Sequence, residues 1–471
     1  MITGSISSRL LCLAVVIAGL VMLGAPSLAQ DSSGQQQRRA KAAGSAKSMV
    51  DPVGSFAPML ARVIPAVVTI RVTSETLAPV ELKPGGGPAG GAAPRKIVSR
   101  SGGSGVIVDA ANGHILTNNH VIDNAVKIEV VLSDGRLLPA RLVGRDIGTD
   151  LAVVEVAERR LPQVKVGDSD KVRVGDVVAA VGNPFGLEGT ATLGIVSASM
   201  RNEIGHEAFE DFLQIDAVIN PGNSGGALVN VRGELIGINT ATAGTVGNVG
   251  IGFAIPINMA RQIKAELIRT GHMKRGSPGL MVEDLSYERA AELMSGTNRG
   301  AIITGVVAGS PAAAAGIKPG AIVTEVSGKP VRGAAEFNTR VVTVPLGTIL
   351  PVVVREAGKD RRYELATAEL KLATPEYTMP ADLGGIAGLV VADIALGNPH
   401  YGDLRGSQVV RVPPGSAAAV TGLQAGDVIV KLDDNNVRRS EHLYRYADRA
   451  GMSYRLHVVR DGVPGWLRVS R

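Results

Sequence analysis

Residues 220–226 read Asn-Pro-Gly-Asn-Ser-Gly-Gly, and this run decides how the chain is interpreted. A serine hydroxyl needs a base to take its proton and fixed N–H donors for the oxyanion that forms when it attacks a carbonyl. Gly222 can adopt backbone angles that cost other residues energy, so its N–H and that of Ser224 can point into one hole. The run therefore predicts a nucleophile at Ser224 and an oxyanion hole formed by Gly222, Asn223 and Ser224.

Two other interpretations of the same run have to be weighed. One is an ordinary glycine-rich loop, and the other is the G-x-S-x-G elbow of α/β-hydrolases, which needs a helix directly after the serine and a histidine far downstream. Residues 227–241, ALVNVRGELIGINTA, carry aliphatic and β-branched residues on both sides of an Arg232-Gly233 turn. This pattern predicts two strands, which disfavours the elbow and leaves an esterase as a distant alternative.

A base and an acid for Ser224 are sought upstream of it. Of the seven histidines, His120 stands near the end of the apolar run LTNNHVI beside small polar residues, where an imidazole can face a cleft. A purely structural histidine is the alternative. Asp150 precedes the apolar strand LAVVEV, where Thr149 and backbone N–H groups could satisfy it. Asp146 is the second candidate for the acid and Asp134 a weaker one.

The strand pattern places these residues in two groups. One series of short strands, separated by turns, spans residues 104–156 and a second spans residues 174–256. Two such series predict two antiparallel barrels. His120 and Asp150 fall in the first barrel and Ser224 in the second, in the His-Asp-Ser order of chymotrypsin-type enzymes. We therefore predict a triad of these three residues across the cleft between the barrels.

The hydrophobic period changes to that of a helix at residues 259–270. Asn258 is a plausible N-cap for this helix and Gly271 a plausible stop. Beyond it, an internal repeat has an offset of 106 residues and pairs Gly316 with Gly422. The repeat predicts two similar modules. Ala321 departs from the repeat, which has Asp427 at that place.

The composition and the net charge limit the classes of protein to which the chain can belong. With 471 residues, 45% hydrophobic residues and 59 glycines, the chain is predicted to form about three globular, turn-rich domains. The net charge of +6 comes from scattered residues. The loose basic cluster at residues 38–47 has no aromatic platform, so we expect a solvated tether and no nucleic-acid partner.

Residues 1–29 have the form of a secretory signal. Arg9 precedes an apolar run of 14 residues, and Ser27-Leu28-Ala29 resembles a cleavage site. We expect cleavage after Ala29, with an uncleaved anchor as the alternative. The only cysteine, Cys12, lies in this segment. The mature chain is therefore expected to contain no disulfide, no thiol nucleophile and no cysteine-based zinc site, and we expect neither a metal nor a cofactor.

The sequence closely resembles the HtrA, or protease Do, family of secreted serine proteases. The resemblance rests on collinear motifs, including FAPMLARVIPAVV, SGGSGVIVD, HILTNNHVI, GTDLAVVEV and DAVINPGNSGGALVN, and continues through both repeats. It implies a mainly β chain with a chymotrypsin-like double antiparallel β-barrel followed by two PDZ domains. The expected parts are a signal peptide at 1–29, a flexible tether at 30–54, the protease domain at 55–271, and PDZ domains at 275–371 and 382–471.

The resemblance also implies a function. The expected activity is ATP-independent serine endopeptidase cleavage of unfolded or misfolded envelope proteins in the periplasm, together with chaperone activity. Homotrimers or multiples of trimers are implied, with residues 56–60 contributing to the trimer contact. A sensor loop is implied at residues 199–209, where Arg201 is the candidate contact and a solvated arginine the alternative. A PDZ-bearing chaperone or scaffold with a resting or inactive protease domain is the competing function.

The specificity pocket should be built from residues just before the nucleophile loop and on the returning strand. These are Val218, Ile219, Thr240, Ala241 and Thr242. Because none is a carboxylate, a basic P1 residue would lack a partner, and we expect a small aliphatic P1 residue such as Val or Ala.

The two PDZ modules should add C-terminal peptides as strands, with loop N–H groups holding the carboxylate. The expected binding residues are Gly279 and Leu280 in the first module and Gly388 and Leu389 in the second. Pro278 departs from the family pattern. Because proline has no N–H, it removes one possible carboxylate donor from the first module.

Overall fold

The computed structural model describes residues 55–82, 95–183, 189–201, 211–242, 250–293, 298–369, 376–394, 398 and 404–470. The predicted signal peptide, the tether and most of the predicted sensor loop lie outside the described residues. Among the residues within these ranges, no helix combines the length and the apolar character needed to cross a membrane.

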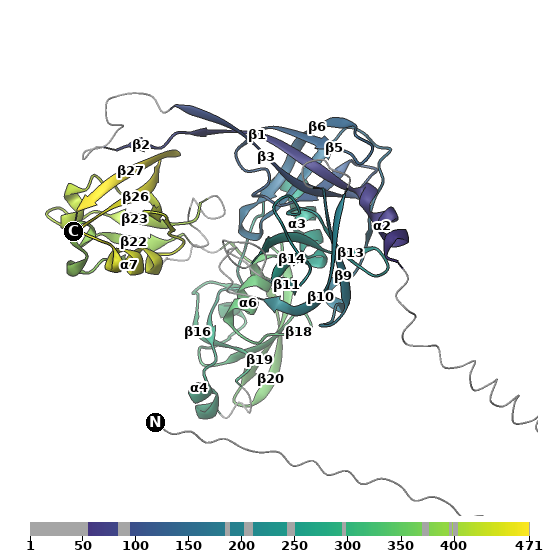
Figure 1. Ribbon diagram of the computed structural model, residues 1–471. Coiled ribbons are helices and arrows are strands. Elements are labelled where there is room, and N and C mark those ends of the chain that lie inside the picture. The colour runs from purple at the N-terminus through teal and green to yellow at the C-terminus, as the bar shows by residue number, and fades with distance from the viewer. Residues whose placement is uncertain are drawn as a thin grey trace, which may run out of the picture. The chain divides into compact units, whose positions relative to one another are not determined.

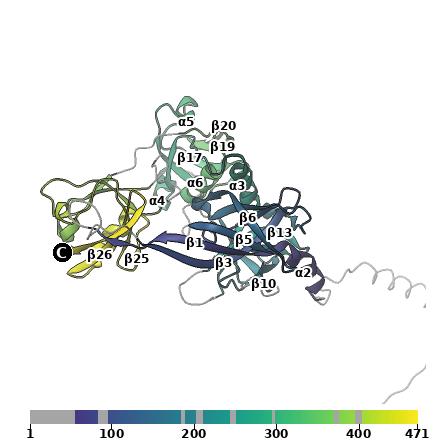
Figure 2. The same ribbon diagram turned by 90° about the horizontal axis from the view of Figure 1, so that it is seen from above.

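The first barrel is closed and has six strands. A short helix α2 (Ala57–Val63) and a 3-10 turn (Ile64–Ala66) lead into it. Its strand order is β1-β3-β4-β7-β6-β5. The strands are β1 (Val67–Leu77), β3 (Lys96–Asp109), β4 (His114–Thr117), β5 (Ala125–Val131), β6 (Leu137–Asp146) and β7 (Leu151–Val156). β1 and β3 form one long antiparallel pair, which is visible in both views (Figure 1, Figure 2).

The second barrel is a ring of six strands in which β12 pairs with both β9 and β13. The strands are β9 (Val177–Gly182), β10 (Thr190–Arg201), β11 (Phe212–Ile215), β12 (Ala227–Asn230), β13 (Glu234–Thr242) and β14 (Gly252–Pro256). Strand β8 (Lys165–Val166) adds to β13 in parallel, and a 3-10 turn covers Ser169–Lys171. Another 3-10 turn, Ile147–Thr149, joins β6 to β7 of the first barrel. The two strands predicted after the serine are confirmed as β12 and β13, which excludes the hydrolase elbow.

Helix α3 (Ile257–Thr270) follows the second barrel and buries Ile257, Ala260, Ile263 and Leu267 in the core. Its predicted stop at Gly271 is confirmed: Gly271 has φ +81° and donates its N–H to Leu267 O. The predicted N-cap at Asn258 is wrong, because the helix begins at Ile257, two residues earlier than predicted, and Pro256 occupies the cap position. The Asn258 amide instead donates to the Asp168 carboxylate at 2.7 Å.

Two further sheets follow, each with the same strand order. The third sheet runs β15-β16-β17-β19-β20 and the fourth contains β22-β23-β24-β26-β27 in the corresponding order, as the repeat predicts. Elements of the third are β15 (Leu280–Asp284), α4 (Tyr287–Glu292), β16 (Ala301–Val306), α5 (Pro311–Ala314), β17 (Ile322–Val326), β18 (Lys329–Pro330), α6 (Ala334–Val342), β19 (Ile349–Glu356) and β20 (Lys359–Ala366).

The fourth sheet has an additional strand at each edge. Its elements are β22 (Val390–Asp393), β23 (Ser407–Arg411), β24 (Val428–Leu432), β25 (Asn435–Asn436), α7 (Ser440–Arg449), β26 (Ser453–Arg460) and β27 (Val463–Ser470), with 3-10 turns at Ala381–Ile386 and Ala417–Val420. Strand β21 (Glu376–Thr378) pairs with β22, and β2 (Val80–Glu81) pairs with β27. The edge strand β2 comes from the segment that follows β1 in the first barrel (Figure 1).

Candidate active site

The loop around Ser224 packs tightly enough to require its glycines. A Cβ on Gly225, which has φ +81°, would lie 2.1 Å from Ser104 O, and a Cβ on Gly226 would lie 2.2 Å from Val181 O. Ser104 belongs to β3 of the first barrel and Val181 to β9 of the second. The two glycines therefore let the loop of Ser224 fit closely between β3 of the first barrel and β9 of the second.

His120 and Asp150 are in direct contact, as the sequence predicts. The His120 Nδ1 lies 2.7 Å from Asp150 Oδ2, and the His120 backbone N–H donates to Asp150 Oδ1 at 2.9 Å. Asp150 is buried, whereas the His120 side chain is 50% exposed. Asp150 also adopts the left-handed conformation, φ 57°, at the end of a 3-10 turn. The Asp150 carboxylate thus holds the imidazole at Nδ1, while half of the His120 side chain stays exposed.

The third contact of Asp150 differs from the sequence prediction. Thr240 Oγ1 donates to Asp150 Oδ2 at 2.7 Å, whereas the hydroxyl of Thr149 donates to Asp146. The prediction that Thr149 satisfies Asp150 is therefore wrong. Thr149 precedes Asp150 in the turn, and its side chain returns to the start of that turn.

Asp146, the second candidate for the acid, is occupied elsewhere. It accepts from Gly148 N at 3.2 Å and forms a buried ion pair of 2.6 Å with Arg275. The weaker candidate, Asp134, pairs with Arg136, whose backbone N–H is the main cause of a lowered Asp134 pKa. Asp150 is therefore the carboxylate that holds His120.

Ser224 has a hydroxyl contact outside the predicted triad, and its loop carries one feature expected around a nucleophile. Its hydroxyl donates to Thr240 O at 3.0 Å. The N–H groups of Asn223, Gly225 and Gly226 are bonded to backbone carbonyls. Within the described parts of the chain, the N–H groups of Gly222 and Ser224 have no recorded acceptor, and Gly222 has φ +100°. These two donors are the ones that the sequence assigns to an oxyanion hole.

Ser104 supports this loop, and the sequence assigned it no role. Its hydroxyl donates to Gly222 O at 2.5 Å and accepts from Asn183 N at 2.8 Å, while its N–H donates to Ser224 O at 2.8 Å. Thr117 Oγ1 donates to Ser104 O at 2.7 Å. Ser104 is fully buried. The run Ser-Gly-Gly-Ser-Gly directly before an apolar strand was the signal that could have indicated such a contact.

The residues assigned to the specificity pocket differ in their surroundings. Val218 is 40% exposed, whereas Ile219 and Thr240 are buried. The Thr240 hydroxyl faces the candidate acid, as described above, and the side chains of Ala241 and Thr242 lie outside the described residues. The nearby carboxylate of Asp216 accepts Ile195 N at 2.6 Å and so serves strand β10.

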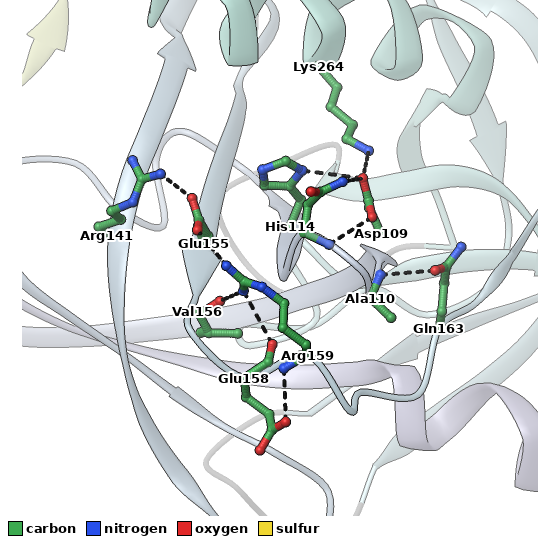
Figure 3. Close-up of polar contacts among 11 residues, drawn as sticks. Asp109, Ala110, His114, Arg141, Glu155, Val156, Glu158, Arg159, Gln163 and Lys264 are labelled. Atoms are coloured by element: carbon green, nitrogen blue, oxygen red, sulfur yellow. Dashed lines mark hydrogen bonds and ion pairs between the residues drawn. The ribbon is translucent and has the colours of Figure 1, made fainter.

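A second His-Asp pair lies on the β3–β4 hairpin (Figure 3). His114 Nδ1 lies 3.5 Å from Asp109 Oδ2, and Lys264 of α3 approaches the same oxygen at 3.8 Å. Asn112 donates both its backbone and its side-chain N–H to Asp109, and the side-chain bond is the main cause of a lowered Asp109 pKa. This carboxylate holds a turn together, so His114 is a structural histidine.

The predicted carboxylate loops of the two repeats have backbone donors that are already in use. In the third sheet, Gly279 N donates to Ser277 Oγ at 3.0 Å, and Leu280 begins β15. In the fourth, Gly388 N donates to Met379 O at 2.9 Å, and Leu389 O accepts from Met379 N at 2.8 Å.

Comparisons with known proteins agree with this architecture. The model of the trypsin-like peptidase domain matches residues 103–238, and that of the PDZ domain matches residues 302–338 and 408–460. The periplasmic serine endoprotease DegP of Escherichia coli is 38% identical over 437 residues, which cover 86% of this chain and 90% of DegP. The periplasmic pH-dependent serine endoprotease DegQ of Escherichia coli is 41% identical over 420 residues, covering 87% of this chain and 90% of DegQ.

A solved structure of an HtrA-type protease, AlgW with tripeptide, has a TM-score of 0.53 and 38% identity. It covers 67% of this chain and 97% of that chain.

Proposed function

The chain belongs to the HtrA family of serine endopeptidases, and we propose that it hydrolyses unfolded or misfolded envelope polypeptides through an acyl-enzyme on Ser224, without ATP. The observation that carries this proposal is the position of Thr240, whose hydroxyl contacts Asp150 and whose carbonyl contacts Ser224. A single residue thus links the His120–Asp150 pair of the first barrel to the serine of the second.

His120 acts as the base in this proposal. The Ser224 hydroxyl turns from Thr240 O to the imidazole, which takes its proton as the oxygen attacks the carbonyl and returns it to the leaving amine. Asp150 accepts from Nδ1 and so keeps the proton-accepting Nε2 directed away from itself. It also stabilises the imidazolium that forms.

The oxyanion is held by the N–H groups of Gly222 and Ser224, with Asn223 shaping the turn between them. Loss of one such donor typically raises the barrier by about 3 kcal/mol. Val218, Ile219, Thr240, Ala241 and Thr242 line the P1 site, where the absence of a carboxylate favours Val or Ala over Lys or Arg.

The two PDZ domains bind C-terminal peptides by strand addition in this proposal, through Gly279 and Leu280 in the first and Gly388 and Leu389 in the second. The enzyme works in the periplasm after removal of residues 1–29 and assembles as a homotrimer or a multiple of trimers. The names of the DegP and DegQ relatives support the compartment.

A second candidate function is a PDZ-bearing chaperone whose protease domain rests inactive. The observation in its favour is that the Ser224 proton is directed to Thr240 O at 3.0 Å. In the proposal this is a resting state that substrate reverses, whereas in the alternative it is permanent.

Digestion of an unfolded protein such as reduced casein separates the two functions. We expect the wild-type chain to degrade it without ATP, with cuts mainly after Val or Ala, and Ser224→Ala to leave it intact. Cuts mainly after Lys or Arg would contradict the pocket assignment. Equal degradation by Ser224→Ala would contradict the peptidase mechanism.

A further inference from the structure

The outer edge of β22 in the second PDZ domain holds a strand of the chain itself. In the first PDZ domain β15 occupies the corresponding end of the sheet, and no strand is recorded beyond it among the described residues. In the second PDZ domain that place is taken by β21, which comes from the segment just before the domain. A peptide that adds to a PDZ sheet would need this edge.

β21 pairs with β22 in the direction and register of an added peptide. The strands are antiparallel, with Glu376 opposite Ala392 and Thr378 opposite Val390. Their direction brings the C-terminal end of the segment to the loop of residues 386–389. There Met379 N donates to Leu389 O at 2.8 Å and Gly388 N donates to Met379 O at 2.9 Å. Gly388 N is one of the donors expected to hold a ligand carboxylate.

Met379 is the anchor of the segment. Its side chain is 3% exposed and belongs to the core cluster of the domain, together with Leu389 and Leu443 of the neighbouring helix α7. Tyr377, two residues earlier, is 48% exposed. Burial is therefore concentrated at the residue next to the carboxylate loop, as it would be for the last residue of a C-terminal peptide.

The chain reverses directly after the anchor. Pro380 has φ −57° and no N–H, and Gly384 interrupts the following 3-10 turn with φ +58°. Only six residues separate Met379 from Ile386, the first residue of the carboxylate loop. The segment and the loop that it contacts are thus held close together by a short connection, which favours their association over that of a free peptide.

We propose that residues 376–379 are an internal ligand of the second PDZ domain, which must be displaced before this groove takes a C-terminal peptide with a Met-like apolar last residue. The proposal rests on the proposed peptide-binding function of the PDZ domains. A free peptide supplies a charged carboxylate where Met379 supplies one neutral carbonyl oxygen, so the peptide gains a stronger contact with the loop donors. The free peptide can bind only to grooves that the internal segment has left. Its apparent affinity is therefore its intrinsic affinity multiplied by the fraction of open grooves.

A reversible covalent lock tests the proposal. Glu376 and Ala392 are opposite each other, and Glu376 is exposed while Ala392 is small and buried. In the full chain carrying Ser224→Ala and Cys12→Ala, the pair Glu376→Cys and Ala392→Cys should form a disulfide when oxidised. The probe is a decapeptide ending in Glu-Tyr-Thr-Met with a free carboxylate, titrated calorimetrically. Sites on the first PDZ domain are unchanged between the two redox states.

We expect the oxidised protein to lose the peptide site that the reduced protein shows, with affinity at that site reduced by at least about tenfold. Met379→Asp, which places a charge in the core cluster, should release the segment and raise the affinity of the site by about tenfold. Glu376→Gln, a change at an exposed side chain in the same segment, should bind like the starting protein. The amidated decapeptide should bind more weakly than the free acid to the released groove.

If the oxidised and reduced proteins bound the decapeptide equally well, the proposal would be overturned, even if Met379→Asp failed to fold. Labelling of Ser224 by a fluorophosphonate in the wild-type chain reports on the peptidase independently. Intact labelling with unchanged peptide binding would therefore refute the internal ligand alone.

Discussion

Thr240 joins the two halves of the candidate triad at the scale of a single residue. Its hydroxyl donates to Asp150 at 2.7 Å in a buried setting, and a hydrogen bond to a charged group there contributes about 1.5–3 kcal/mol. We expect Thr240→Val to lower kcat/KM by about tenfold, because the Asp150 carboxylate then loses one of the hydrogen bonds that hold it beside the imidazole. Hydrolysis of a peptide with Val at P1 measures the change.

Thr240→Ser is the matched control, since it keeps the hydroxyl and the backbone carbonyl. Its kcat/KM should stay within about threefold of that of the wild type. If both variants were equally active, the hydroxyl contact to Asp150 would have no catalytic role.

The triad residues could be predicted from the sequence. The hydrogen bonds that hold the triad in place could not. His120, Asp150 and the loop of Ser224 were predictable because each sits at a recognisable strand end or turn. Ser104 was not predicted, and Thr240 was assigned only to the specificity pocket, because the contacts of Ser104 with Gly222 and of Thr240 with Asp150 join residues 118 and 90 positions apart along the chain. Such contacts depend on how the barrels meet, and the Ser-Gly-Gly-Ser-Gly run can indicate a close approach without indicating its partner.

At the scale of strands and helices, an ion pair in the second PDZ domain has no counterpart at the equivalent place in the first. In the second domain, Asp427 of the turn before β24 accepts from Arg460 Nε and Nη2 at 2.7 and 2.6 Å, and the pair raises the Arg460 pKa. In the first domain Ala321 is buried at the equivalent place. The departure noted in the repeat is thus the replacement of a buried charge by an apolar residue.

Removing one partner of this pair should therefore be costly. We expect Asp427→Ala to destabilise the second PDZ domain by about 3 kcal/mol, because Arg460, whose side chain is only 12% exposed, is left without its counter-ion. The double variant Asp427→Ala with Arg460→Met should recover most of the loss. Hydrogen exchange of β24 and β26 in the full chain measures both, and equal protection of the single and double variants would contradict this explanation.

The other edge of the same domain depends on a glycine. Leu82, which follows β2, is buried in the core of the second PDZ domain and donates its N–H to Trp466 O at 3.0 Å. A Cβ on Gly465 would lie 2.6 Å from Leu82 Cγ. Gly465→Val should therefore separate β2 from β27, with faster hydrogen exchange of the Leu82 amide.

Gly451→Val provides the matched control, because a Cβ at Gly451 meets no atom within 4 Å. Exchange at Leu82 should then remain slow. Fast exchange in the control, or slow exchange in Gly465→Val, would show that the steric contact does not decide the docking of β2.

At the scale of the whole molecule, we expect acid to destabilise the chain through its second PDZ domain. Burial is the main cause of a lowered His442 pKa, and Arg438 N donates to His442 Nδ1 at 3.4 Å, which requires an unprotonated nitrogen. A lowered folded-state pKa means that this contribution is complete above the ordinary value of 6.5 and is lost as the pH falls through the folded-state pKa.

Calorimetry of the full chain between pH 7.5 and 5 tests the effect. We expect the transition of the second PDZ domain to move to a lower temperature on acidification, and to move less in His442→Asn, whose side-chain oxygen can replace Nδ1 as an acceptor. Equal shifts in both proteins would assign the pH dependence to other groups.

The two strand series and the repeat were readable from the sequence, because they are local and periodic. The two added edge strands of the second PDZ domain were not. Residues 79–94 and 372–384 have the composition of a loop and a linker, and Val80–Glu81 and Glu376–Thr378 become strands only through pairing with a distant or following strand. Tertiary pairing here overrides what the local composition indicates.

Active-site labelling tests the central claim most directly. A fluorophosphonate reacts only with a serine whose hydroxyl is activated and whose oxyanion hole is formed. We predict that, with an unfolded protein present, the reagent attaches to Ser224, that the label maps to the peptide spanning residues 220–226, and that His120→Ala and Ser224→Ala abolish it. Labelling that persisted in Ser224→Ala, or its absence from the wild type with and without substrate, would contradict the account.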